Sequence, residues 1–318
     1  MSNYILKRVR SAIAVLFVVS IITFLIVKLI PGDAAQFILG TDATPEALAN
    51  MREALGLNRP WYVQYFSWLK DLLHFDLGVS YIFGEKVSVL IGQRLPVTIA
   101  LTLFSMTLVA IFSIVLGVLA AIKKNTFVDY FTRTIMQLGS AFPSFWIGMI
   151  FIVYFGLKLK LFPVSGFVDI SEGLMPHLKS IVLPGTVLAI AEISMALRTV
   201  RTSMLGALQE DFMDMARVKG LKNHVMYFKY ALRSALVAPV NVWGMQFAKL
   251  IGGTAVVETV FALPGLGRLV VVAVEQRDLI LLQGIVVFVT ALVIIITLAV
   301  DIGVMFINPR IRIETQGD

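Results

Sequence analysis

The chain has 318 residues, of which 58% are hydrophobic and 15% charged, and it contains no cysteine. Soluble domains are about 45–50% apolar and about 25% charged. This composition therefore argues against a water-soluble globule, a basic nucleic-acid-binding domain and a disordered chain. Without cysteine there is no disulfide, thiolate nucleophile or cysteine metal site. The mean hydropathy of +0.88 indicates a membrane protein. The composition does not show which class of membrane protein it is, and only sequence motifs can indicate that.

A helix needs about 20 predominantly apolar residues to cross a bilayer core of about 30 Å. The chain is therefore predicted to be an all-α membrane protein with six spans, at residues 11–30, 97–122, 135–156, 181–197, 240–261 and 281–306. The first apolar run is too long for the core of a signal peptide, which has about 7–15 residues. We expect it to be a retained helix.

The distribution of basic residues predicts how these spans are oriented. With six spans, both termini share one side of the membrane with the loops at residues 123–134 and 198–239. That side carries 15 of the 27 lysines and arginines, whereas the other side carries 10. Because cytoplasmic loops are enriched in Lys and Arg, we expect both termini to be cytoplasmic. The same asymmetry explains the positive net charge without a nucleic-acid partner.

The external segment at residues 31–96 has its own helix signals. Thr44 followed by Pro45 is typical of a helix start, and Gly56 is expected to end that helix. A second, amphipathic helix is predicted after Pro60, with aromatic residues at helical spacing. It fits a helix in the membrane interface, where Trp and Tyr are common, and a partner-docking surface is the alternative.

The internal loop at residues 198–239 contains a second recognisable pattern. A helix is predicted over residues 205–218, and Gly220 is expected to end it in the left-handed C′ position. A short second helix can then leave in a new direction. The pattern fits either a groove on another protein or the lipid surface. The apolar stripe of the first helix consists of Leu205, Leu208, Phe212, Met215 and Val218.

Within this loop, the sequence DFMDMARVKGL at residues 211–221 resembles the EAA loop of ABC importer permeases, in the version of the dipeptide, oligopeptide and nickel subfamily. The resemblance covers nearly the whole chain. The chain departs from the family at Phe75, where glycine is usual, and at Asn308, where aspartate is usual. The other matching motifs are PGD at 31–33, LGL at 55–57, QY at 64–65, DLGVS at 76–80, RLPVT at 94–98, PSFWIG at 143–148, VETVF at 257–261, PGLG at 264–267, RD at 277–278 and PRIR at 309–312.

The resemblance implies a single permease domain over residues 1–318, of the type I ABC importer kind and similar to the first permease of the pair. Such a chain forms half of an alternating-access pathway in a bacterial or archaeal plasma membrane. The implied partners are a second homologous permease, two cytoplasmic ATPase subunits and an external substrate-binding protein. The implied substrates are di- or oligopeptides, with nickel or a metal chelate as the alternative.

No catalytic, cofactor or metal site is predicted in this chain. It has no Gly-Lys pair and hence no P-loop, so ATP and Mg are expected on the partner ATPase subunits. The three histidines are far apart in sequence, and no zinc-protease motif occurs. An ATP-independent carrier or channel is the alternative from another class. It would predict internal repeats and paired discontinuous helices, and neither is visible.

The resemblance assigns the coupling of ATP hydrolysis to the internal loop at residues 198–239. A stiff helix end there would sit in a groove of the ATPase. Gly220 would permit the turn, Ala216 would permit close approach, and charged residues would contact the rim. The residues expected to couple are Asp211, Asp214, Ala216, Arg217, Lys219 and Gly220.

Ionisable residues inside membrane spans usually face the bundle interior or a water-filled cavity. Lys249 could pair with Glu192, with a partner subunit or with a substrate carboxylate. Glu258 could form a gate contact or attract a peptide amine, and Asp301 is expected to make a structural hydrogen bond. The PGLG stretch is expected to be a tight, non-helical external loop. The candidate residues of the translocation path or gate are Lys249, Glu258, Pro264, Gly265 and Gly267.

Overall fold

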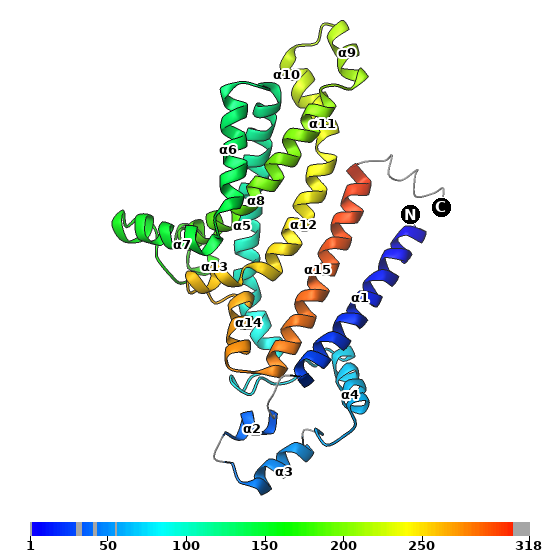
Figure 1. The fold of residues 1–318 in the computed structure, drawn as a ribbon, viewed down its shortest axis with the longest axis vertical. Helices are drawn as coiled ribbons and strands as arrows, with labels where there is room; N and C mark the ends of the chain where they lie inside the picture. Colours follow the sequence, from blue (N-terminus) through cyan, green and yellow to red (C-terminus); the bar gives the residue numbers. More distant parts are fainter. Residues whose placement is uncertain (1, 30–33, 41–42, 55, 308–318) are drawn as a thin grey trace. The chain divides into compact units, whose positions relative to one another are not determined.

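The computed structural model describes residues 2–29, 34–40, 43–54 and 56–307 (Figure 1). Regular structure in these residues is helical, apart from one isolated antiparallel bridge between Val79 and Lys86. The prediction of an all-α protein is thus confirmed for this part of the chain. The PGD motif at 31–33 and the PRIR motif at 309–312, with Asn308 before it, lie outside the described residues.

The helices follow one another along the chain as Figure 1 labels them. The first group is α1 (Ser2–Leu29), α2 (Ala34–Leu39), α3 (Pro45–Ala54), α4 (Trp61–Leu73), α5 (Val87–Ile122), α6 (Phe127–Ala141), α7 (Ser144–Phe151), the π-helix η1 (Ile152–Lys158) and the 3₁₀ turn η2 (Ile170–Glu172). The second group is α8 (Leu174–Ala207), α9 (Asp211–Val218), α10 (Asn223–Val225), the π-helix η3 (Met226–Ala231), α11 (Leu232–Ala235), α12 (Val237–Gly253), α13 (Ala255–Val260), α14 (Leu266–Glu275) and α15 (Leu279–Ile307).

Among the described residues, four helices are long and apolar enough to cross a membrane, namely α1, α5, α8 and α15. A fifth candidate is the pair formed by α6 and the helical segment 144–158, which is bent by 100°. The prediction of one continuous helix over residues 135–156 is therefore wrong. The bend falls at Phe142 and Pro143, where proline disfavours helical backbone at the residue before it. Figure 1 shows α7 leaving the direction of α6 at this point.

Two other predicted boundaries also differ from the structure. The RLPVT motif was expected to open the second span, but Pro96 lies inside α5, which begins at Val87. The fifth span was expected over residues 240–261. It is divided into α12, which has 17 residues, and the short α13, with Thr254 between them.

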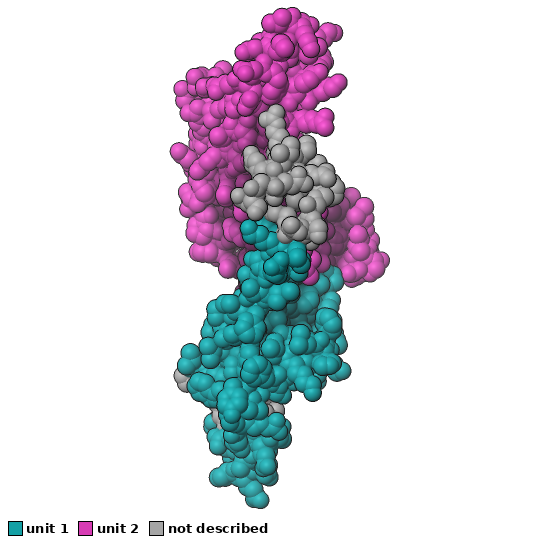
Figure 2. Space-filling view, turned by 90° about the vertical axis from the view of Figure 1, so that its right-hand side faces the viewer, with its two compact units in different colours: residues 1–96, 265–294 teal, residues 97–264, 295–318 magenta. Residues whose placement is uncertain are grey.

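The described chain divides into two compact units, which are coloured separately in Figure 2. The first unit contains residues 1–96 and 265–294. Its core is a cluster of apolar side chains from the start of α5, from α14 and from the first half of α15. The fully buried residues of this core include Val87, Leu266, Leu281 and Ile285. The core holds the start of α5 against α14 and α15.

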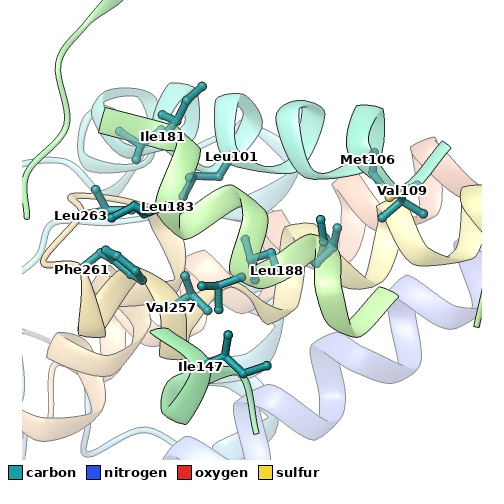
Figure 3. Close-up of a cluster of buried hydrophobic side chains, with 14 of the residues drawn as sticks. Leu101, Met106, Val109, Ile147, Ile181, Leu183, Leu188, Val257, Phe261 and Leu263 are labelled. Atoms are coloured by element: carbon teal, nitrogen blue, oxygen red, sulfur yellow. The ribbon is translucent and has the colours of Figure 1, made fainter. Parts of the chain in front are cut away.

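The second unit contains residues 97–264 and 295–318, and it has two apolar cores. The larger core joins α5, α7, α8, α12 and α13, and Figure 3 shows Leu101, Leu183 and Phe261 among its side chains. The helices α6 and α8 pack closely at Gly139, where an added Cβ atom would lie only 2.9 Å from the backbone oxygen of Ile190. Only glycine permits this approach.

The helical insert after the first span is confirmed where it is described. Helix α3 begins at Pro45, and the Thr44 hydroxyl accepts a hydrogen bond from the Ala47 N–H at 3.3 Å. Gly56 has a φ of +64° and follows the end of this helix. The predicted helix after Pro60 is α4. Its aromatic side chains include the exposed Trp61, Tyr62 and Phe66.

Two loop predictions are wrong. The PGLG stretch was expected to be non-helical, but helix α14 begins at Leu266, so that Gly267 is a buried helical residue. A single helix was expected over residues 205–218. Instead, α8 ends at Ala207 and a new helix, α9, begins at Asp211. Asp211 and Asp214 in the first turn of α9 favour a helix start there, because acidic side chains stabilise helix N-termini.

Candidate functional site

The motif-bearing loop forms the short helix α9, which lies with α10 at one end of the second unit (Figure 1). Its inner face carries Met213 and Ala216, which are buried. They pack in the second apolar core of this unit, with Val200 and Met204 of α8 and Met226 of η3. This core fixes α9 to the end of α8.

The outer face of α9 differs from the apolar stripe that the sequence predicts. Met215 and Val218 are 63% and 86% exposed, whereas Leu205 and Phe212 pack against the second core. The predicted stripe required one continuous helix through residues 208–210. Because α8 ends at Ala207 and α9 begins at Asp211, the residues before and after the break do not share one helix face. Ala216 also faces the chain's own core, and two large apolar side chains project outward instead.

Charged side chains surround these exposed apolar residues. Asp214 and Arg217 form an exposed ion pair of 2.7 Å between Oδ1 and NH1. Asp211 and Lys219 are also exposed. Exposed ion pairs contribute only about 0–1 kcal/mol to stability. The pair therefore adds little to holding α9 in place.

Gly220 ends α9 as the sequence predicts, with a φ of +68°. Its N–H donates to the oxygen of Arg217 at 2.9 Å, and the N–H of Leu221 donates to the oxygen of Ala216 at 3.2 Å. These two bonds form a Schellman motif, in which the C′ residue adopts the left-handed conformation. A Cβ atom on Gly220 would meet nothing within 4 Å. The glycine is needed here for its backbone conformation and not for space.

A charge network that joins α6 to α8 was not predicted from the sequence. Asp129 of α6 is fully buried and accepts from Nε and NH2 of Arg201 of α8, at 2.6 and 2.9 Å. Arg133 and the N–H of Asn125 also donate to Asp129, at 2.8 and 3.0 Å. The spacing of four residues between Asp129 and Arg133 is the only sequence feature that could have indicated an ion pair here. The bidentate contact joins residues 72 positions apart.

Lys249 and Glu192 form an ion pair, which is one of the three contacts that the sequence allowed for Lys249. The distance from Nζ to Oε1 is 2.6 Å, and it joins α12 to α8. The glutamate side chain is 7% exposed, whereas the lysine side chain is 71% exposed. Gln246, one turn before Lys249, donates to the backbone oxygen of Glu192 at 2.8 Å. The pair thus buries its anion and presents its cation at the surface of the unit.

Glu258 is fully buried in α13. Its Oε1 atom accepts hydrogen bonds from the hydroxyls of Thr98 and Thr254, each at 2.7 Å. This environment fits a contact that holds α13 against α5, and it leaves no access to a peptide amine. Asp301 lies partly buried in α15.

The remaining gate candidates lie around the start of α14. Pro264 and Gly265 precede this helix, and Gly267 lies within it. Within the residues that the structure describes, no group of three or more His, Asp or Glu side chains could hold a metal ion.

Comparison with known proteins gives two matching families that together cover most of the chain. Residues 113–313 match the family described as "Binding-protein-dependent transport system inner membrane component", and residues 1–102 match its N-terminal family. The chain belongs to the family of binding-protein-dependent transport system inner membrane components. It is thus a multi-pass permease of the inner membrane and part of an ABC complex, and members of this family lack ATPase activity.

Curated relatives match over nearly their whole length. A peptide transport system permease protein of Brucella abortus is 40% identical over 314 residues, which is 99% of this chain and all of the relative. A peptide ABC transporter permease protein of Sinorhizobium fredii is 41% identical over 98% of this chain and all of the relative. The glutathione transport system permease protein GsiC of Escherichia coli is 36% identical over 98% of this chain and 99% of the relative.

Proposed function

We propose that this chain forms half of the alternating-access pathway of an ATP-driven importer of di- and oligopeptides. The names of the relatives support a peptide substrate over nickel or a metal chelate, because two are named as permeases of peptide transporters and the third as a permease for glutathione, itself a tripeptide. The observation that carries the coupling to ATP is the short helix α9, anchored to α8 by an apolar core and ended by Gly220.

In this proposal the chain crosses the membrane six times. The bent pair of α6 and segment 144–158 is the third span, and α12 with α13 is the fifth. Helix α12 alone is about 25 Å long at 1.5 Å per residue, so α13 is needed to complete the crossing. The distribution of Lys and Arg supports a cytoplasmic position for the termini and α9. The segment 31–96 is then an extracytoplasmic insert within a single permease domain, which we propose for residues 1–318.

The proposed partners are a second homologous permease, two cytoplasmic ATPase subunits that bind ATP and Mg, and an external binding protein that delivers the peptide. Met215 and Val218 would enter a groove of one ATPase subunit, while Asp211, Asp214, Arg217 and Lys219 contact its rim. When the ATPase dimer closes, the second apolar core would pass the movement from α9 to α8. Lys249 and the gate residues Glu258, Pro264, Gly265 and Gly267 belong to the proposed path.

Uptake of a radiolabelled dipeptide into proteoliposomes tests this function. The complete complex should take up the peptide only with ATP and the binding protein, and nickel should not compete. Full uptake after ATP depletion, or purification of the chain without an ATPase, would contradict the proposal.

Variants at Gly220 test the coupling site itself. A non-glycine residue in the left-handed conformation costs about 1–2 kcal/mol, and a β-branched one costs more, whereas asparagine tolerates it. We expect Gly220→Val to insert normally but to lose most ATP-driven uptake, and Gly220→Asn to keep most of it. Wild-type uptake by Gly220→Val would show that the turn does not matter for coupling.

A further inference from the structure

A pocket of about 640 Å³ lies within the first unit, whereas the candidate coupling residues belong to the second unit. Its size falls within the range of small-molecule sites, which is about 300–1,000 Å³. Its walls come from the end of α1, the segment after α3, helix α4, the segment after α4 and the first turns of α15. None of the coupling or path residues discussed above lines it.

The walls are held by specific contacts. Tyr65 of α4 shares a hydrogen bond of 2.9 Å with Ser20 of α1, and its ring meets Phe24 at 5.4 Å between centroids. Gln64 accepts from Lys28 and donates to the backbone oxygens of Leu57 and Arg59, the latter two at 3.0 and 2.7 Å. These bonds tie α1, α4 and the segment between α3 and α4 together. The shape of the pocket is therefore fixed by specific contacts between its walls.

The polar part of the lining contains both signs of charge. Three cationic side chains, Lys28, Arg52 and Arg59, and two carboxylates, Asp71 and Asp76, contribute to it. Gln283 of α15 also lines the pocket and is only 8% exposed. Its Nε2 atom finds no hydrogen-bond acceptor within the described part of the chain. A buried donor without a partner costs about 1–3 kcal/mol, so this one indicates a ligand that accepts a hydrogen bond.

The position of the pocket along α1 indicates what this ligand is. Lys28 lies at the last turn of the apolar segment Leu6–Leu29, which is long and apolar enough to cross a membrane. A lysine at the end of such a span would lie where the hydrocarbon core meets the lipid headgroups. Trp61 and Tyr62 of α4 are 56% and 67% exposed, as expected for an aromatic belt at this level. The apolar part of the lining fits the first carbons of acyl chains and includes Phe24, Val27, Trp68, Leu77, Leu279 and Ile280.

We propose that this pocket binds the headgroup of a zwitterionic phospholipid, an ethanolamine phospholipid being the test case. The phosphate group accepts from Gln283 and the cationic side chains. The ammonium group is neutralised by the carboxylates of Asp71 and Asp76. The lipid joins α1, α4 and α15 at the membrane surface. With the orientation of the proposed function it belongs to the outer leaflet.

Native mass spectrometry of the assembled complex, with phosphatidylethanolamine or phosphatidylglycerol added in equal amounts, tests this site. We expect Arg59→Gln to lower retention of phosphatidylethanolamine at least fivefold. Lys70→Gln, a change on α4 outside the pocket, should leave retention unchanged. Asp71→Asn should shift the preference toward phosphatidylglycerol. Equal lipid retention by all these variants would overturn the proposal, as would displacement of the lipid by inorganic phosphate or by a dipeptide.

The variant Gln283→Met gives a second measurement with opposite expected signs. If the pocket stayed empty, removing an unpartnered buried amide would raise the Tm of the complex. If the pocket binds the headgroup, the same change lowers both lipid retention and the Tm in phosphatidylethanolamine. A raised Tm with unchanged retention would overturn the proposal. Dipeptide uptake is measured in parallel, because a wrong substrate assignment would leave the lipid result unaffected.

Discussion

Arg201 of α8 binds both carboxylate oxygens of Asp129 of α6, through Nε at 2.6 Å and NH2 at 2.9 Å. The aspartate is fully buried, and the arginine side chain is 14% exposed. This pair joins two helices of the second unit six residues before α8 ends at Ala207. Removing one partner of a buried pair leaves the other charge desolvated and costs about 3–5 kcal/mol.

We therefore expect Asp129→Asn to destabilise the complex by about 3 kcal/mol. Arg201→Lys should cost less, because the lysine keeps the charge but loses the fork that binds both oxygens. Thermal unfolding of the purified complex measures both changes. Asp214→Asn is the matched control, since it breaks an exposed pair and should cost less than about 1 kcal/mol. A similar loss in Asp129→Asn and Asp214→Asn would show that burial of Asp129 does not matter.

Local signals allowed the sequence to predict several features correctly. The Thr44 cap, the stops at Gly56 and Gly220, and helix α4 depend on neighbouring residues only. The bend at Pro143 and the break before Asp211 were missed, because an apolar run shows its length but not where its axis turns. The Asp129–Arg201 contact was missed because it joins residues far apart in the chain.

In the candidate site, too, the sequence predicted local features but not the packing between distant segments. The sequence predicted a helix that ends at Gly220, although not its start at Asp211, and it offered Glu192 as one possible partner of Lys249. It could not show that Ala216 faces the chain's own core, or that Met215 and Val218 project outward. Which face of a short helix is buried depends on the helices around it, and these come from distant parts of the sequence.

The ion pair between Lys249 and Glu192 predicts an asymmetry between two substitutions. Lys249→Met leaves a carboxylate that is 7% exposed without its cation, and it should cost about 1–3 kcal/mol. Glu192→Gln leaves a lysine that is 71% exposed, and because the proposed translocation path supplies water to it, this change should cost less than about 1 kcal/mol. Thermal unfolding of the complex compares them. Equal losses would mean that the glutamate has another source of stabilisation.

Phe75 has a φ of +59°, at a position where the family resemblance implies glycine. Its side chain is 89% exposed, so packing does not compensate for the strained backbone. The left-handed conformation costs about 1–2 kcal/mol for a residue with a Cβ atom. We expect Phe75→Gly to raise the Tm of the complex by about 1–3 °C, and Phe75→Ala to give no such gain. A gain of equal size with alanine would attribute the effect to loss of the exposed ring.

Tyr81 predicts a pH dependence at the alkaline end. Its hydroxyl donates to the backbone oxygen of Arg277 and accepts from the N–H of Leu279 at 2.9 Å, so it joins the segment after α4 to the start of α15. Burial raises the pKa of Tyr81 from 10.0 to about 12, and the nearby Asp278 carboxylate adds to the rise, while the hydrogen bond from Leu279 opposes it.

Because the folded state holds this proton more tightly than the unfolded state, the stabilisation is complete below about pH 10 and is lost as the pH rises toward about 12. Tyr81→Phe should lower the Tm of the complex at neutral pH, since both hydrogen bonds are lost, and should flatten its decline in this alkaline range. Tyr62→Phe, an exposed change on α4, should decline like the wild type. Parallel Tm curves for the wild type and Tyr81→Phe would contradict the link between burial of this hydroxyl and alkaline stability.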